Sequence, residues 1–220
     1  MKPIITPGIK EIVPFFVAIF FIAIQSKQLQ AQLPDIIWQN TIGGMQDDIL
    51  TRLAHTSDGG AIIGGTSLSG ISADKTEGVV GGLTNAEDFW IVKVDATGAI
   101  TWQNTIGGSA DDFLTALATT PDGGYIVGGY SNSNIGGDKT VTHYLGGTYG
   151  YDYWVLKLNS TGGISWQKSF GGLSDDYLMD IEVTDDGGFI VAGSSYSGVS
   201  GNKTASNFGM RDYWILKLDA

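Results

Sequence analysis

The sequence predicts an all-β protein made of three tandem four-stranded antiparallel units, arranged as β-propeller blades. Three observations support this prediction: marker residues recur every 64 positions, β-branched and aromatic residues dominate the segments between them, and glycine is abundant. Glycine supplies 33 of the 220 residues, which is typical of a chain with many tight turns. We therefore expect a β-repeat domain over residues 32–220, with units at 36–99, 100–163 and 164–220.

Residues 1–31 have the pattern of a secretory signal peptide. Lys2 and Lys10 precede an uncharged apolar run at 12–24, and a polar stretch that ends at Ala31 follows it. A membrane-spanning helix needs about 20 apolar residues, so this run is short for an anchor. We expect cleavage after Ala31 and a secreted chain without a membrane segment, and an uncleaved anchor is the alternative.

The composition excludes several classes of function. The net charge is −11, and an acidic surface repels phosphate backbones, so nucleic acid is not an expected partner. The chain has no cysteine, which excludes disulfides, thiolate zinc sites and a cysteine nucleophile. An exported domain of this kind must be stabilised by packing alone.

The repeat is defined by sets of residues that keep their order in each unit. A tryptophan is followed by Gly-Gly, Asp-Asp, an Asp-Gly-Gly turn, a Lys-Thr segment and a closing Asp-aromatic-Trp. The repeated tryptophans are Trp38, Trp102 and Trp166 at the start and Trp90, Trp154 and Trp214 at the close. Only the last closing set is displaced, by a four-residue deletion between Lys203 and Asp212. We therefore expect the three units to fold alike.

Each unit contains four strand-like segments. In the first unit they are 36–42, 49–56, 61–66 and 89–95, and the turn at Asp58 joins the second and third as a hairpin. The third segment carries paired small residues, which permit close backbone approach near the axis of a radial array.

The fourth segment is apolar on both faces. Trp90 and Val92 alternate with Phe89 and Ile91, and the other units repeat the pattern. A sandwich strand would show one polar face. Each sheet is therefore expected to be covered on both sides by neighbouring sheets.

The run from Trp102 to Gly129, WQNTIGGSADDFLTALATTPDGGYIVGG, is similar to β-propeller repeats of secreted bacterial proteins, especially of the Bacteroidetes group. The segment from Asp152 to Trp166, DYWVLKLNSTGGISW, carries the same resemblance, which covers 36–220. It implies a protein of the bacterial cell surface or exterior, and it supplies no catalytic residues. Such proteins commonly end in a sorting tail, whereas this chain stops at Ala220.

A second likeness concerns the turn Asp95-Ala-Thr-Gly98 before Trp102 and its copy before Trp166. It resembles the tryptophan-docking turn of quinoprotein propellers, in which glycine makes the turn and the indole packs between blades. The implied role is structural, and no quinone site or other cofactor is expected from it.

The acidic pairs are the first candidate binding groups. Their carboxylates suit calcium, but acidic pairs beside glycine also cap turns, and no EF-hand spacing is present. The structural role is favoured, and calcium is the alternative. The six residues are Asp47, Asp48, Asp111, Asp112, Asp175 and Asp176.

Three lysines recur on the otherwise apolar fourth segment, at Lys93, Lys157 and Lys217. An unpaired buried charge is costly. We therefore expect each lysine to form an ion pair with a nearby acidic side chain, in the acidic pairs or at Asp58 and its copies.

The long loops between the third and fourth segments are the second candidate. Loops of this length are either functional or loosely ordered. Lys139, Tyr144, Tyr149 and Tyr151 could form an edge that binds a glycan or a protein. The alternative is a hairpin whose polar side chains satisfy the turn backbone.

Catalysis has little support in the sequence. His55 and His143 occupy positions that do not repeat, and no nucleophile elbow, Walker loop or histidine metal pair is present. We expect no enzymatic activity. A secreted hydrolase or a quinoprotein-like enzyme is the alternative.

Three blades are fewer than the usual four to eight of a propeller. Three arrangements stay open: part of a longer array, two copies that complete a six-bladed ring, or closure of the three units into a β-prism. The expected function is a binding or structural scaffold at the cell surface, with a carbohydrate-binding module as the alternative.

Overall fold

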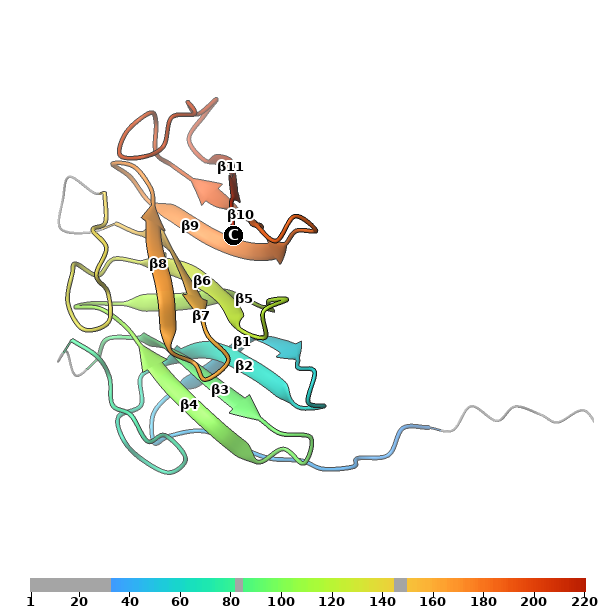
Figure 1. Cartoon of the computed structure of the whole chain (residues 1–220). Helices are drawn as coiled ribbons and strands as arrows, with labels where there is room; N and C mark the ends of the chain where they lie inside the picture. The colour runs from blue at the N-terminus through green and yellow to red at the C-terminus, as the bar shows by residue number, and fades with distance from the viewer. Residues whose placement is uncertain (1–32, 82–84, 145–149) are drawn as a thin grey trace, which may run out of the picture. The chain divides into compact units, whose positions relative to one another are not determined.

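The computed structural model describes residues 33–81, 85–144 and 150–220, which contain strands, turns and bends but no helix. Accordingly, no membrane-spanning helix is found within these ranges. The strands form three antiparallel sheets that follow one another along the chain (Figure 1). The all-β prediction is confirmed, and the three sheets are arranged as part of a propeller.

The first sheet has the order β1 (Asp48–His55), β2 (Ala61–Ser67), β3 (Asp88–Val94) and β4 (Ile100–Ile106). The second repeats it with β5 (Asp112–Thr119), β6 (Tyr125–Ser131), β7 (Asp152–Leu158) and β8 (Ile164–Phe170). The third has β9 (Asp176–Val183), β10 (Phe189–Ser195) and β11 (Asp212–Leu218).

The sheets are offset by one strand from the predicted units. β4, the first segment of the second unit, pairs with β3 of the first unit, for example Trp90 opposite Thr105. The fold class is as predicted, but the strand pairing differs from the predicted units. The first and second sheets each take their fourth strand from the next unit, and the third sheet has three strands. Residues 36–42 were predicted as a strand and are not one, since no earlier unit offers them an edge within the described residues.

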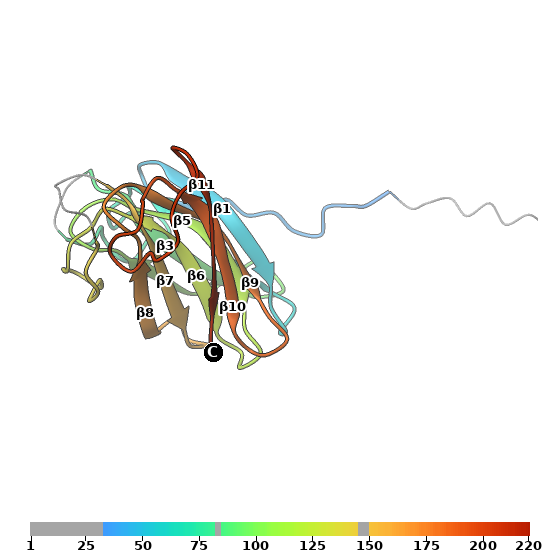
Figure 2. The same cartoon turned by 90° about the horizontal axis from the view of Figure 1, so that it is seen from above.

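The second sheet is covered on both faces, as its two-sided apolar strand predicts. Toward the first sheet, the rings of Trp154 and Phe89 lie 5.2 Å apart; toward the third, those of Tyr153 and Trp214 lie 5.0 Å apart. The first strands β1, β5 and β9 contact one another in turn. Seen from above, along the stack, the three sheets overlap (Figure 2). Burial of apolar area between the sheets is the main source of stability.

The first and third sheets do not close on each other. Leu53 on β1 is 65 % exposed, and Tyr213 and Ile215 on β11 are 90 % and 63 % exposed. Closure into a β-prism would have covered these side chains. The prism alternative is therefore wrong, since both outer faces of the stack meet solvent.

Residues 37–220 form one compact unit. Residues 33–36, described separately, have no regular secondary structure. The predicted signal peptide at 1–31 lies outside the described residues and stays a prediction.

Candidate functional site

The second aspartate of each acidic pair anchors a loop. Asp48 Oδ2 accepts from Gly44 N at 2.6 Å and from the Ser69 hydroxyl at 3.0 Å. The equivalent distances are 2.6 and 2.9 Å for Asp112 with Gly108 and Ser133, and 2.8 and 2.8 Å for Asp176 with Gly172 and Ser197. These carboxylates therefore hold the Gly-Gly turn against the start of each sheet.

The first aspartate of the pair joins neighbouring sheets. Asp111 Oδ1 accepts from Glu87 N at 3.3 Å, and Asp175 Oδ1 accepts from Tyr151 N at 3.1 Å. For Asp47, the backbone carbonyl accepts from Leu68 N at 3.0 Å. No group of three acidic or histidine side chains suited to a metal ion occurs in the described ranges. These contacts give the carboxylates of the acidic pairs a structural role.

Three carboxyl groups have strongly raised pKa values. Burial raises the pKa of Asp88 and of Asp152 to about 7, and that of Asp112 to about 6. Such shifts often mark catalytic groups. All three side chains are fully buried, however, so a substrate cannot reach them.

Lys139 was predicted at a ligand-binding edge, and this prediction is wrong. Its side chain is fully buried, its Nζ donates to Ser131 Oγ at 2.6 Å and lies 5.1 Å from the centroid of the Trp154 ring. Lys75 stands over Trp90 in the same way, at 5.0 Å. The physical reason is that the long stem and the ammonium cover the indole and fix the loop to it.

The tyrosines of the predicted edge have different environments. Tyr149 lies outside the described residues. Tyr144 is partly exposed, whereas Tyr151 is half-buried in an aromatic cluster with Phe113, Tyr130 and Tyr177. The ring centroids of Tyr151 and these neighbours are 5.2 to 5.9 Å apart. Tyr151 thus packs between the second and third sheets.

The repeated tryptophans that begin each unit dock onto turns. A Cβ added to Gly162, whose φ is +86°, would lie 2.7 Å from the Trp102 indole. Trp102 in the first sheet therefore packs on the turn of the second sheet, as the tryptophan-docking pattern predicts. Trp166 similarly reaches the third sheet, with its ring centroid 6.0 Å from that of Phe189.

Sequence reasoning missed a cleft between the first and second sheets, at the end where the Asp-Gly-Gly turns lie. Its volume is about 520 Å³. The side chains that line it include His55, Thr56, Ser57, Asp58, Lys93, Thr101, Trp102 and Tyr125. Trp102, Lys93 and Asp58 each have an equivalent in every unit, and this recurrence was the signal that could have indicated the cleft.

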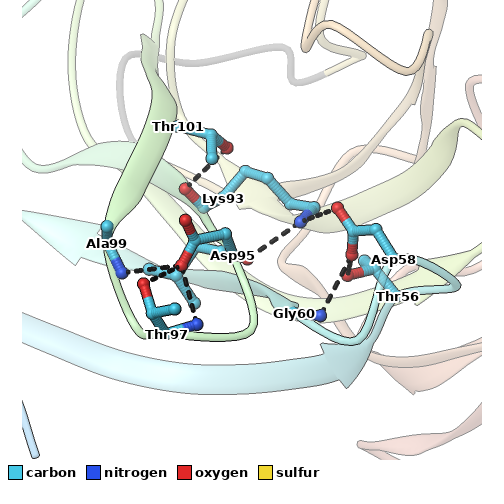
Figure 3. Close-up of polar contacts among 9 residues, drawn as sticks. Thr56, Asp58, Gly60, Lys93, Asp95, Thr97, Ala99 and Thr101 are labelled. Carbon is cyan, nitrogen blue, oxygen red and sulfur yellow. Dashed lines mark hydrogen bonds and ion pairs between the residues drawn. The ribbon is translucent and has the colours of Figure 1, made fainter.

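An ion pair forms the polar wall of this cleft (Figure 3). Lys93 Nζ lies 2.7 Å from Asp58 Oδ2, and Asp58 Oδ1 accepts from the Thr56 hydroxyl at 2.6 Å and from Gly60 N at 3.0 Å. These contacts hold the pKa of Asp58 well below its usual value, and the hydrogen bond with Lys93 has the largest effect. The carboxylate of Asp58 is half-exposed, whereas Lys93 is buried.

The predicted lysine pairing is confirmed in all three units. Lys157 Nζ lies 2.8 Å from Asp122 Oδ2, and Lys217 Nζ lies 2.9 Å from Asp186 Oδ1. The aspartates belong to the Asp-Gly-Gly turns. Lys93 also donates to Val94 O at 2.8 Å, so its ammonium is fixed from two sides (Figure 3).

Aromatic rings form the other wall. The centroids of Trp102 and Tyr125 lie 5.8 Å apart, with the ring planes inclined by 59°. A second cleft of about 320 Å³ repeats the arrangement between the second and third sheets. Its side chains include Asp122, Lys157, Trp166 and Phe189. Each cleft therefore combines aromatic faces with an ionised carboxylate and an ammonium.

The comparisons with known proteins do not identify this chain. No protein-family model matches the sequence, and no curated protein proved similar to it.

Proposed function

We propose that this chain is a secreted or cell-surface bacterial scaffold without catalytic activity, which binds carbohydrate in the clefts between its sheets. The observation that carries the proposal is the recurrence of one cleft at two successive junctions, with aromatic and charged side chains at equivalent positions. Export rests on the N-terminal sequence pattern, and the bacterial cell surface rests on the repeat resemblance.

The chemistry of the cleft suits a sugar. The apolar face of a pyranose packs on an indole, while its hydroxyls need donors and acceptors at the rim. Trp102 offers the ring, Asp58 offers an acceptor that is ionised at neutral pH, and Thr101 offers a hydroxyl. A volume of about 520 Å³ accommodates one or two sugar rings.

Repetition favours a polymer as the ligand. A single shallow site binds weakly, but two sites that engage one chain convert the second contact into an intramolecular step. The clefts at Trp102 and Trp166 belong to successive junctions of the stack. We therefore expect an extended polysaccharide to bind more tightly than its monosaccharide.

The ionisation states support binding rather than hydrolysis. A glycosidase needs a carboxylic acid that is protonated near neutral pH and accessible to substrate. Asp58 faces the cleft, but its pKa is lowered. Asp88 and Asp152 have raised pKa values but are fully buried.

The proposal is tested by affinity electrophoresis and calorimetry of the full chain against a panel of bacterial and plant polysaccharides. We expect at least one ligand whose affinity falls about tenfold in Trp102→Ala and further in Trp102→Ala with Trp166→Ala. Asp58→Asn keeps the shape of the cleft but removes the charged partner of buried Lys93, so it should weaken binding, and circular dichroism of the variant checks that the chain is folded.

Tyr144→Ala is the matched control, because Tyr144 is an exposed aromatic residue outside both clefts. Binding unchanged by the cleft substitutions, or lost in Tyr144→Ala, would contradict the cleft as the binding site. Failure of every polysaccharide to bind would overturn the proposed function.

A further inference from the structure

The outer edge of β11 lacks a neighbour that the other sheets have. β3 pairs with β4 and β7 pairs with β8, whereas β11 pairs with β10 alone in the described part of the chain. β11 reads DYWILKL and β7 reads DYWVLKL, so the two edges are chemically almost the same. We propose that residues 37–42 of a second copy of this chain pair with β11 as the fourth strand of the third sheet, so that copies associate head to tail.

Residues 37–42 have the sequence that this edge requires. They read IWQNTI, and the strands that pair with β3 and β7 read ITWQNTI and ISWQKSF. The segment has no regular secondary structure in the single chain. A strand sequence without a partner and an edge without a strand thus coexist in one molecule.

The segment already lies where an outer strand of a preceding sheet would lie. The Trp38 indole packs on Gly98, where an added Cβ would be 2.6 Å from the ring, and Asn40 Nδ2 donates to Gly98 O at 3.1 Å. The same contacts recur one repeat later, with Trp102 on Gly162 and Asn104 Nδ2 donating to Gly162 O at 2.9 Å. Residues 37–42 are therefore docked on the first sheet with their own pairing partner absent from the described residues.

A glutamine completes each full sheet. Gln103 Oε1 accepts from Trp90 Nε1 and from Thr76 N, both at 3.1 Å, and its Nε2 donates to Asp74 O at 2.6 Å. Gln167 makes the same contacts with Trp154 Nε1, Thr140 N and Asp138 O, at 3.1, 3.1 and 2.7 Å.

In the third sheet this glutamine is missing. No acceptor binds Trp214 Nε1 among the described residues, and the side chain of Gln39 is exposed. Gln39 lies 64 positions before Gln103. In the proposed pairing, Gln39 of one copy accepts from Trp214 Nε1 of the other.

The two open faces of the stack match each other. Leu50 and Leu53 on the first sheet are exposed. Their equivalents on the second sheet, Leu114 and Leu117, are buried because they pack against the first sheet. Tyr213 and Ile215 on the third sheet are exposed, although their equivalents Tyr153 and Val155 are fully buried. Stacking a third sheet on a first sheet would bury both sets and place Tyr213 beside Trp90, as Tyr153 lies beside Trp214.

Charge also distinguishes this junction. At the two junctions within the chain, Asp111 and Asp175 accept from the backbone of Glu87 and Tyr151. The equivalent pair at the proposed junction is Asp47 and Arg211. The cation therefore lies on the sheet whose outer face is open among the described residues, and in the proposed junction it attracts Asp47 of the other copy.

We call the open face of the first sheet, with Leu50 and Leu53, the head, and the open face of the third sheet, with Tyr213 and Ile215, the tail. The association is heterologous, since the head of one copy contacts the tail of the next. Two copies that join at both ends make six sheets, within the four to eight of closed propellers. This inference concerns self-association and does not rest on carbohydrate binding.

The register supplies a direct test. Ile91 lies opposite Asn104 in the first sheet, so Ile215 of one copy is expected opposite Asn40 of the other. The chain has no cysteine, so engineered cysteines are the only thiols. Full-length Asn40→Cys and Ile215→Cys chains, mixed and mildly oxidised, should form a disulfide-linked heterodimer in excess of either homodimer.

The matched control is Leu216→Cys with Asn40→Cys, because successive residues of a strand point to opposite faces of the sheet. This pair should not cross-link. Absence of the heterodimer, or an Ile215→Cys homodimer of equal yield, overturns the proposed pairing.

Sedimentation of complementary variants gives a second, independent test. Leu53→Glu damages the head and Tyr213→Glu damages the tail, and both side chains are exposed in the single chain, so folding should persist. Each variant alone should associate at least about tenfold more weakly than the unsubstituted chain. Their mixture should regain a one-to-one dimer through the intact head of one and the intact tail of the other. Unsubstituted chain that stays monomeric at high concentration, or a mixture no better than the single variants, overturns the proposal.

Discussion

At the residue scale, the repeat buries titratable side chains at the start of its strands. Asp152 is fully buried at the start of β7, its Oδ2 accepts from Tyr144 N, and the nearby charges are Lys139, Asp175 and Asp176. Burial raises its pKa to about 7. The folded chain therefore binds a proton on Asp152 that the unfolded chain has already released.

This shift predicts a pH dependence of stability. Between pH 3.8 and about 7 the folded state holds more protons than the unfolded state, so the free energy of unfolding falls as the pH rises through this window and levels off above it. Asp152→Asn should flatten this part of the curve, since the amide does not titrate. Urea unfolding at about pH 4.5, 6 and 7.5 measures the effect.

Asp58→Asn is the control with the opposite sign. Its folded pKa is lowered, so its contribution is present above pH 3.8 and is lost as the pH falls below that value. This variant should lower the free energy of unfolding by a constant amount above pH 3.8, leave the slope between about pH 4.5 and 7.5 unchanged, and remove the loss of this contribution at lower pH. Parallel curves for Asp152→Asn and the unsubstituted chain would refute the assignment.

Sequence patterns predicted the lysine ion pairs but not the burial of Lys139. Lys93 and its equivalents lie on otherwise apolar strands, so each needed an acidic partner, which for Lys93 is Asp58. Lys139 lies in a loop, where exposure is the ordinary expectation. Its contact with Trp154 joins residues that the sequence separates, and only the fold brings them together.

At the element scale, each sheet has a bulge opposite a glycine. The register of β5 against β6 shifts between Leu114 and Ala116, and Gly129 lies there with no room for a side chain. A Cβ on Gly129 would lie 1.8 Å from Phe113 O, a backbone atom that cannot move away on its own. The glycine pair that predicted close backbone approach thus permits the first strand to bend.

Gly129→Ala should therefore destabilise the chain by about 2–3 kcal/mol, because the methyl group must push β5 and β6 apart. Denaturant unfolding monitored by tryptophan fluorescence measures the change. Gly70→Ala is the control, since an added Cβ there meets nothing within 4 Å, and its midpoint should stay unchanged. Equal effects of the two substitutions would count against the steric argument.

The strand content was predictable from local sequence, and the strand partners were not. Alternating β-branched and aromatic residues located the strands, including β4 and β8. Whether such a segment joins the preceding or the following sheet depends on tertiary contacts such as Trp90 Nε1 with Gln103. The cleft could not be predicted from local sequence for the same reason, because its walls come from two different sheets.

At the scale of the whole molecule, position in the stack decides what a repeated residue contributes. Tyr153 and Tyr213 occupy equivalent positions, yet Tyr153 is fully buried between two sheets and Tyr213 faces solvent. In a stack where each sheet contacts only its neighbours, stability is a sum of sheet and junction contributions. Identical substitutions should then have very different effects at the middle and at the end.

Tyr153→Ala should lower the free energy of unfolding by about 3–5 kcal/mol, because it leaves a cavity at the junction with the third sheet and removes the ring contact with Trp214. Tyr213→Ala should change it by less than about 0.5 kcal/mol, at dilutions where the chain is a monomer. Urea unfolding of both variants gives the comparison. Two substitutions of similar cost would mean that the outer face of the third sheet is covered even in the single chain, and the open stack would then be the wrong description of the molecule.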